Sequence, residues 1–132
     1  MDRRQVTKAP APKPVLPPPA PTPVPKPALS AAEYSQHGRK LIAEEHYAES
    51  IEPLSEALRL DPTLSPTFNA RGYAYFRLKK YKQAIADFDQ AISLNPAYGN
   101  AYTNRSSAKR AAGDKAGADA DQAKARELLV KK

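Results

Sequence analysis

The residues best suited to acid–base or metal chemistry in this 132-residue chain are two histidines, His37 and His46. No carboxylate stands at a ligand or proton-relay spacing around both of them. The chain contains no cysteine, so thiolate chemistry and disulfide bonds are excluded. The glycine-containing segment 113–117 predicts a turn and a helix start rather than a phosphate-binding loop. We therefore expect a protein that is not an enzyme and that binds no cofactor or metal.

The most regular feature of the sequence is a period of 34 residues. Stacked in three blocks, 31–64, 65–98 and 99–132, the chain places similar residues in the same column. One column holds only aromatic residues and another only alanine: Tyr34, Phe68 and Tyr102; Ala57, Ala91 and Ala125. A fixed period of this length indicates repeated supersecondary units. Stacked helical units mainly build binding surfaces, so the pattern favours binding over catalysis.

Each block is predicted to form a helical hairpin. In block 65–98, apolar residues recur at helical spacing over 68–76 and again over 81–92. The break at 78–80 is so short that the two helices must be antiparallel neighbours. Ser30 and Glu33 form a capping-box pattern, and Ser65 is predicted to cap a helix that starts at Pro66. Pro53 lies inside a predicted helix, where it should kink the helix or cost about 3 kcal/mol or more.

These columns resemble the tetratricopeptide repeat, a family whose motif is also 34 residues long. The resemblance covers residues 30–132 and implies an all-α fold of three helix-turn-helix hairpins in a right-handed superhelical stack. It is most complete in the second block, which carries Phe68, Gly72, Tyr75, Ala84, Phe88, Ala91 and Pro96.

Residues 1–29 differ in composition from the repeats, because they hold ten of the fourteen prolines and no glycine or aromatic residue. We expect a disordered, extended proline-rich tail or linker, with binding to SH3- or WW-type domains as the alternative. No apolar run approaches the length of a membrane span. A soluble cytoplasmic protein is favoured, and a soluble fragment from outside the cytoplasm is the alternative.

The net charge of +7 is distributed unevenly along the chain. The tail and the second and third blocks are basic, whereas block 31–64 has seven acidic residues against three basic ones. A basic surface could bind nucleic acid electrostatically. We expect no such binding, because no aromatic stacking platform accompanies the basic residues.

The resemblance also implies where a partner would bind. In this family the first helix of every hairpin lines a concave groove, and its matching positions here carry three arginines, three asparagines and two aromatic residues. Arginine binds carboxylates bidentately and asparagine bonds to peptide backbone. We therefore predict a non-catalytic adaptor or scaffold module, a monomer, that binds a short acidic peptide. The alternative is a structural or self-associating head on a proline-rich stalk. The predicted peptide-binding residues are Arg39, Asn69, Tyr73, Phe76, Arg77, Asn100, Asn104 and Arg110.

Some members of the family bind the C-terminal tails of chaperones through a two-carboxylate clamp. That clamp needs Lys and Asn in the first helix, Asn in the third, and Lys and Arg in the fifth. The matching positions here hold different residues, so the sequence predicts that chaperone tails are not partners. These positions are Ser35, Arg39, Ala70, Asn100 and Asn104.

Overall fold

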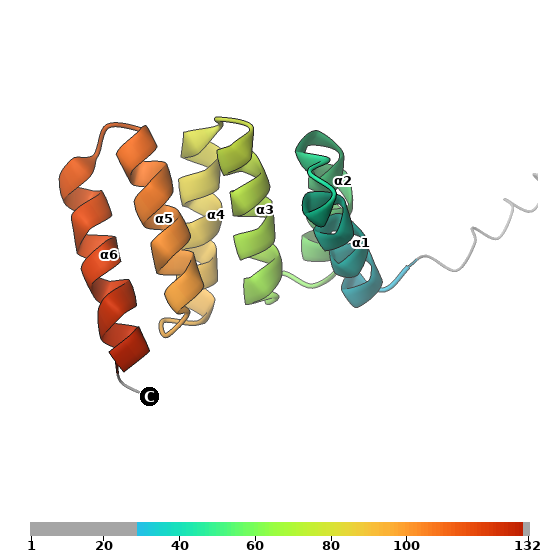
Figure 1. Ribbon diagram of the computed structural model, residues 1–132. Coiled ribbons are helices and arrows are strands. Elements are labelled where there is room, and N and C mark those ends of the chain that lie inside the picture. Colours follow the sequence, from blue (N-terminus) through green and yellow to red (C-terminus); the bar gives the residue numbers. More distant parts are fainter. Residues whose placement is uncertain (1–28, 131–132) are drawn as a thin grey trace, which may run out of the picture.

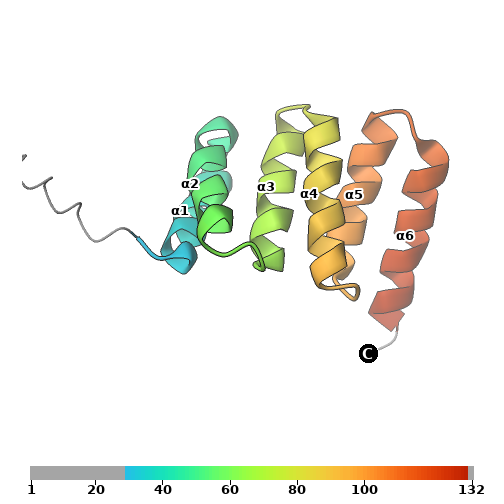
Figure 2. The same cartoon turned by 180° about the vertical axis from the view of Figure 1, so that it is seen from behind.

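The computed structural model describes residues 29–130, and the predicted proline-rich tail lies almost entirely outside this range. Within it the chain forms six helices joined by short turns (Figure 1). Consecutive helices pair into three hairpins that stand in a row, as the reverse view also shows (Figure 2). The all-α class and the stack of hairpins are thereby confirmed. The helices are α1 (Ala31–Ala43), α2 (Tyr47–Leu60), α3 (Ser65–Arg77), α4 (Tyr81–Leu94), α5 (Gly99–Ala111) and α6 (Lys115–Val130).

The same turn closes all three hairpins. Its left-handed residue is Glu45, Lys79 or Gly113, with φ of 63°, 63° and 95°. In each turn the next amide donates 2.8 Å back to a carbonyl five residues earlier. This arrangement satisfies carbonyl groups that would otherwise be orphaned at the helix end. Only the third turn uses glycine, the residue that adopts this conformation without a steric cost.

Close approach of the two helices in a hairpin depends on small residues. A Cβ atom added at Gly72 would lie 2.6 Å from the Phe88 ring, and one added at Gly38 would lie 2.4 Å from Leu54. Phe88 and Leu54 are fully buried, so these contacts lie in the core. The third hairpin has Ser106 in this column, and its hydroxyl donates 2.8 Å to the carbonyl of Ala118 in α6.

Of three predicted local features, one is confirmed, one is wrong, and one stays a prediction. The capping box at Ser30 and Glu33 is present, with bonds of 3.1 and 2.8 Å. The predicted cap at Ser65 is wrong: α3 already includes this residue, and its hydroxyl donates 2.9 Å to the Ala91 carbonyl in α4. Pro53 lies inside α2, which has 14 residues like α4, and the kink or energetic cost expected there stays a prediction.

Two arginines that were not predicted from the sequence join neighbouring hairpins. Arg71 in α3 makes two bonds of 2.8 Å to Asp87 in α4 and donates 3.0 Å to Ser55 in α2. Arg105 in α5 repeats this geometry one period later, bonding to Asp121 in α6 and reaching back to Asp89 in α4. The signal was available in the sequence, because both arginines lie 16 residues before their aspartate in the same repeat columns.

Candidate functional site

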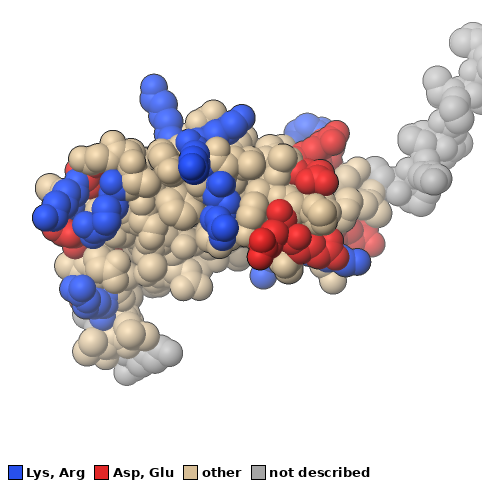
Figure 3. All heavy atoms as spheres, turned by 45° about the horizontal axis from the view of Figure 1, so that its top comes forward, with Lys and Arg blue, Asp and Glu red and all other residues tan. Residues whose placement is uncertain are grey.

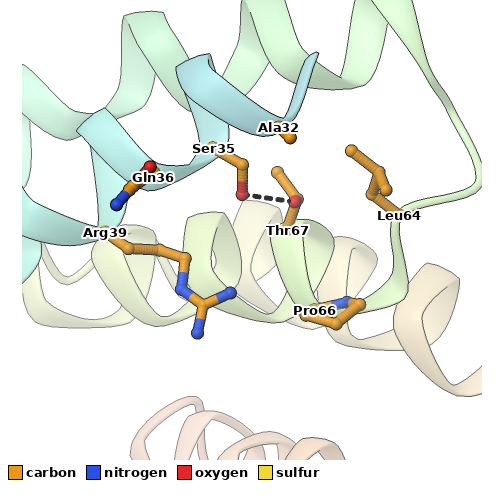
Figure 4. A pocket seen from close by; sticks show the side chains of 7 residues that line it. All are labelled: Ala32, Ser35, Gln36, Arg39, Leu64, Pro66 and Thr67. Atoms are coloured by element: carbon orange, nitrogen blue, oxygen red, sulfur yellow. Dashed lines mark hydrogen bonds between the residues drawn. The ribbon is translucent and has the colours of Figure 1, made fainter. Parts of the chain in front are cut away.

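The first helices of the three hairpins are α1, α3 and α5. They line one side of the stack, where α3 contacts both α1 and α5. Two of the hollows along this side share Arg39. The first, of about 360 Å³, lies between α1 and the start of α3, where Ser35 and Thr67 share a 2.7 Å hydrogen bond (Figure 4). The second, of about 440 Å³, extends across to α5. Arg39 lines both hollows, so they are two parts of one groove.

A short row of amides crosses the second hollow. The side chain of Asn104 in α5 donates 3.0 Å to that of Asn69 in α3. Asn69 in turn donates 3.3 Å to the hydroxyl of Tyr98. These bonds fix the two amides while leaving part of their hydrogen-bonding capacity for a ligand. Asn100 lines the same hollow, and its side chain makes no hydrogen bond within residues 29–130.

Arg39 is the cation of this groove. Its side chain is exposed and makes no hydrogen bond or ion pair with any other residue between 29 and 130. A guanidinium group presents five N–H donors in a planar fork that matches a carboxylate. Arg39 can therefore bind an anion without first breaking a bond inside the protein.

The predicted Arg77 has a different environment. Its guanidinium carbon lies 4.8 Å from the Tyr47 ring centre, and it donates 3.0 Å to the hydroxyl of Tyr73. That hydrogen bond raises the pKa of Arg77, which keeps the group charged. Tyr73 lines the second hollow, whereas Arg77 does not. Arg77 thus positions the tyrosine at the edge of the groove and keeps an exposed charge beside it.

Two other predicted residues are committed to contacts within the protein. Arg110 pairs with Asp119 of α6 at 3.0 Å. Phe76 is half-buried and packs against the cluster of Ala84, Phe88 and Ala108. Neither lines a hollow described above. The groove therefore brings together five of the eight predicted residues: Arg39, Asn69, Tyr73, Asn100 and Asn104.

The far wall of the first hollow was not predicted from the sequence. Leu64, Pro66 and Thr67 form it, at the point where the chain enters α3 (Figure 4). Leu64 precedes α3, whereas Pro66 and Thr67 lie in its first turn, and none of the three was among the predicted peptide-binding residues. The groove thus offers apolar surface in the first hollow, on one side of Arg39, and a row of amides in the second hollow, on the other side.

Residues 29–130 contain no group of three or more His, Cys, Asp or Glu side chains that could hold a metal ion. In that range no helix is both long enough and apolar enough to cross a bilayer.

Comparison with known proteins places this architecture in a family. The tetratricopeptide repeat family model matches residues 65–98. The first such domain of Spaghetti (RPAP3), solved bound to the HSP90 peptide SRMEEVD, is 30% identical with a TM-score of 0.75. That similarity covers 78% of this chain and 82% of the solved one. The chain belongs to the tetratricopeptide repeat family, and the module builds a protein-interaction surface.

Other relatives extend this picture. RNA polymerase II-associated protein 3 of Xenopus tropicalis is 37% identical over 95 residues, which are 72% of this chain and 14% of that protein. The second such domain of human RPAP3, solved with the HSP70 peptide SGPTIEEVD, is 25% identical with a TM-score of 0.73. That similarity covers 77% of this chain and 85% of the solved one. The chain matches only 14–24% of the length of its first curated relatives.

These findings correct the prediction that chaperone tails are not partners. That prediction is wrong as an exclusion, because similar domains are solved with HSP90 and HSP70 peptides. It compared residue types in five columns only. In the structure the second hollow gains an amide from Asn69, one residue before Ala70, and a cation from Arg39. The amide of Asn69 thus lies outside the compared columns, whereas Arg39 lies in one of them and supplies a cation although its residue type differs from the one the clamp needs.

Proposed function

We propose that this module is a non-catalytic adaptor whose groove binds a short acidic peptide ending in a free carboxylate. Both peptides seen with its structural relatives end in Glu-Glu-Val-Asp, so a tail of this chemistry is the ligand class we favour. The observation that carries the proposal is Arg39, an exposed guanidinium without an internal partner at the junction of two hollows.

The chemistry of the two hollows suits such a peptide. A carboxylate would pair with Arg39, and charge-assisted hydrogen bonds of this type are stronger than neutral ones. Asn69, Asn100 and Asn104 would bond to the peptide backbone in the second hollow. The apolar wall of Leu64 and Pro66 in the first hollow would take an aliphatic side chain such as valine.

The test uses fluorescently labelled SRMEEVD and the full chain in an anisotropy titration. Changing Arg39→Ala should weaken binding by about tenfold or more, since a hydrogen bond to a charged group contributes about 1.5–3 kcal/mol. The matched control is Lys40→Ala, which removes the same charge from the next residue of α1, outside both hollows. It should leave the affinity within about twofold.

Two outcomes would contradict the proposal. If the Arg39 and Lys40 variants lose affinity equally, net charge rather than a groove contact determines binding. If a peptide with glutamines for glutamates and an amidated C-terminus binds as well as SRMEEVD, the acidic ligand class is wrong. The cytoplasmic location, the monomeric state and the absence of nucleic-acid binding stay predictions.

A further inference from the structure

A third hollow lies away from the groove, on the outer face of the first hairpin. Its volume is about 240 Å³, and five residues line it: Tyr34 and His37 from α1, and Glu52, Pro53 and Glu56 from α2. The lining thus combines an aromatic ring, a proline ring and two carboxylates. Acidic side chains gather over this end of the molecule (Figure 3).

The other two hairpins show what the same repeat columns normally hold. Arg71 lies over the Phe68 ring, with its guanidinium carbon 5.9 Å from the ring centre. Arg105 lies over Tyr102 in the same way, at 5.5 Å. Each of these arginines also pairs with an aspartate of its own hairpin. The repeat therefore builds, twice, a site in which a cation covers an aromatic ring and meets a carboxylate.

The first hairpin keeps the ring but lacks the cation. Its aromatic residue is Tyr34, whereas His37 stands in the arginine column and Pro53 in the aspartate column. Carboxylates are supplied from neighbouring positions instead. Glu52 is exposed and makes no ion pair or hydrogen bond within residues 29–130. Glu56 accepts a 2.9 Å bond from Nε of Arg59. Glu56 is thus paired with a cation of its own hairpin, whereas Glu52 is an acceptor for which the hairpin supplies none.

We infer that this hollow binds the proline-rich tail of the same chain, with a lysine of a Pro-Lys-Pro segment over Tyr34 and beside Glu52. The tail contains this tripeptide twice, as Pro12-Lys13-Pro14 and Pro25-Lys26-Pro27. A cation over an aromatic face is attracted by the ring quadrupole. Proline-rich segments dock on aromatic-lined surfaces at a low entropic cost, because their backbone is already restricted. In a Pro-Lys-Pro segment, the lysine supplies the cation for the ring and the prolines supply the restricted backbone that docks on the aromatic surface.

Charge and chain length favour the tail over other occupants. The tail carries five basic residues against Asp2, whereas the first repeat has seven acidic residues against three basic ones. Lys26 lies four residues before Ser30, a span of about 12 Å in extended form, and Tyr34 is in the first turn of α1. A tether this short gives an effective concentration in the millimolar range. The groove, by contrast, presents Arg39 and would repel a basic tail.

Paramagnetic relaxation enhancement in the full chain tests this inference. The chain has no cysteine, so Ala20→Cys creates a single site for a spin label between the two Pro-Lys-Pro segments. We expect strong enhancement at the amides of Tyr34, His37 and Glu52 and little at Asp119 in α6. The enhancement should fall several-fold with Lys13→Glu and Lys26→Glu together, and also with Glu52→Lys.

A matched control separates a specific contact from general attraction. Changing Arg3→Glu and Arg4→Glu alters the tail charge by the same amount but leaves both Pro-Lys-Pro segments intact. This control should keep most of the enhancement. Equal losses in the two double variants would overturn the inference, as would enhancement centred on Asn69 and Asn104 in the groove. Enhancement transferred from spin-labelled chains to isotope-labelled chains without a spin label would instead assign the hollow to a second copy, and this too would overturn it.

Discussion

Arg71 neutralises a carboxylate that is almost completely removed from water. The side chain of Asp87 is 6% exposed, and its two oxygens both accept from Arg71. Burial raises the pKa of Asp87 even though Arg71 acts in the opposite direction. The pair at Arg105 differs because Lys109 also reaches Asp121, at 3.1 Å. There burial is outweighed by these hydrogen bonds, and the pKa of Asp121 is lowered.

Removing Arg71 should therefore be costly. We expect Arg71→Ala to lower the free energy of unfolding by about 3 kcal/mol or more, because it leaves a buried charge unpaired and also breaks the bond to Ser55. Urea unfolding followed by circular dichroism measures this. Arg59→Ala is the control, since Arg59 pairs with Glu56 at the surface, where such pairs contribute about 1 kcal/mol or less.

A double variant tests whether the unpaired charge of Asp87 causes this loss of stability. Adding Asp87→Asn to Arg71→Ala removes the unpaired charge and should recover part of the lost stability. If Arg71→Ala costs no more than Arg59→Ala, the arginine does not join the hairpins as described.

The three predicted anion-binding arginines show how far residue types alone reach. Arg39, Arg77 and Arg110 occupy comparable groove columns, so the sequence could not distinguish them. Their surroundings do: Arg39 lacks an internal partner, Arg77 lies on Tyr47, and Arg110 pairs with Asp119. Tyr47 and Asp119 come from other helices than the arginines they contact, and these distances depend on the packing of the helices. That information is absent from one repeat column.

The hairpins were predictable from the sequence, because packing restricts the type of residue that each repeat column can hold. Gly72 must be small since the Phe88 ring lies directly against it, and the third hairpin accepts Ser106 where Gln122 replaces the phenylalanine. Helix ends were less predictable. Ser65 has the residue type of a cap, but a buried bond to Ala91 uses its hydroxyl instead. Tertiary packing overrode the local preference.

Gly72→Ala tests this packing directly. The new Cβ would lie 2.6 Å from Phe88 and 3.1 Å from the Asp87 Cβ, so α3 and α4 must separate. We expect a loss of about 1–3 kcal/mol in the free energy of unfolding, the usual cost of overpacking a core. Gly99→Ala is the matched control in α5, with nothing within 4 Å of the added atom. It should be neutral or slightly stabilising. Equal stability of both variants in thermal unfolding would contradict the account.

The molecule as a whole carries two surfaces of opposite character. Its groove presents Arg39 and a row of asparagines, whereas its first hairpin is acidic on the outside (Figure 3). An acidic peptide would be attracted to the groove, and a basic, proline-rich segment to the outer face. The two proposed ligands therefore do not compete for one site. Each proposal can fail without the other.

The central claim is that the groove binds an acidic peptide, and a chemical-shift titration tests it most directly. Adding SRMEEVD to the isotope-labelled chain should shift the side-chain amide signals of Asn69, Asn100 and Asn104 and the backbone amide of Arg39. The amides of Glu52 and Asp119, which lie outside both groove hollows, should stay in place. If the asparagine signals do not move at saturating peptide, or if the shifts centre on the outer face of α1 and α2, the groove is not the binding site.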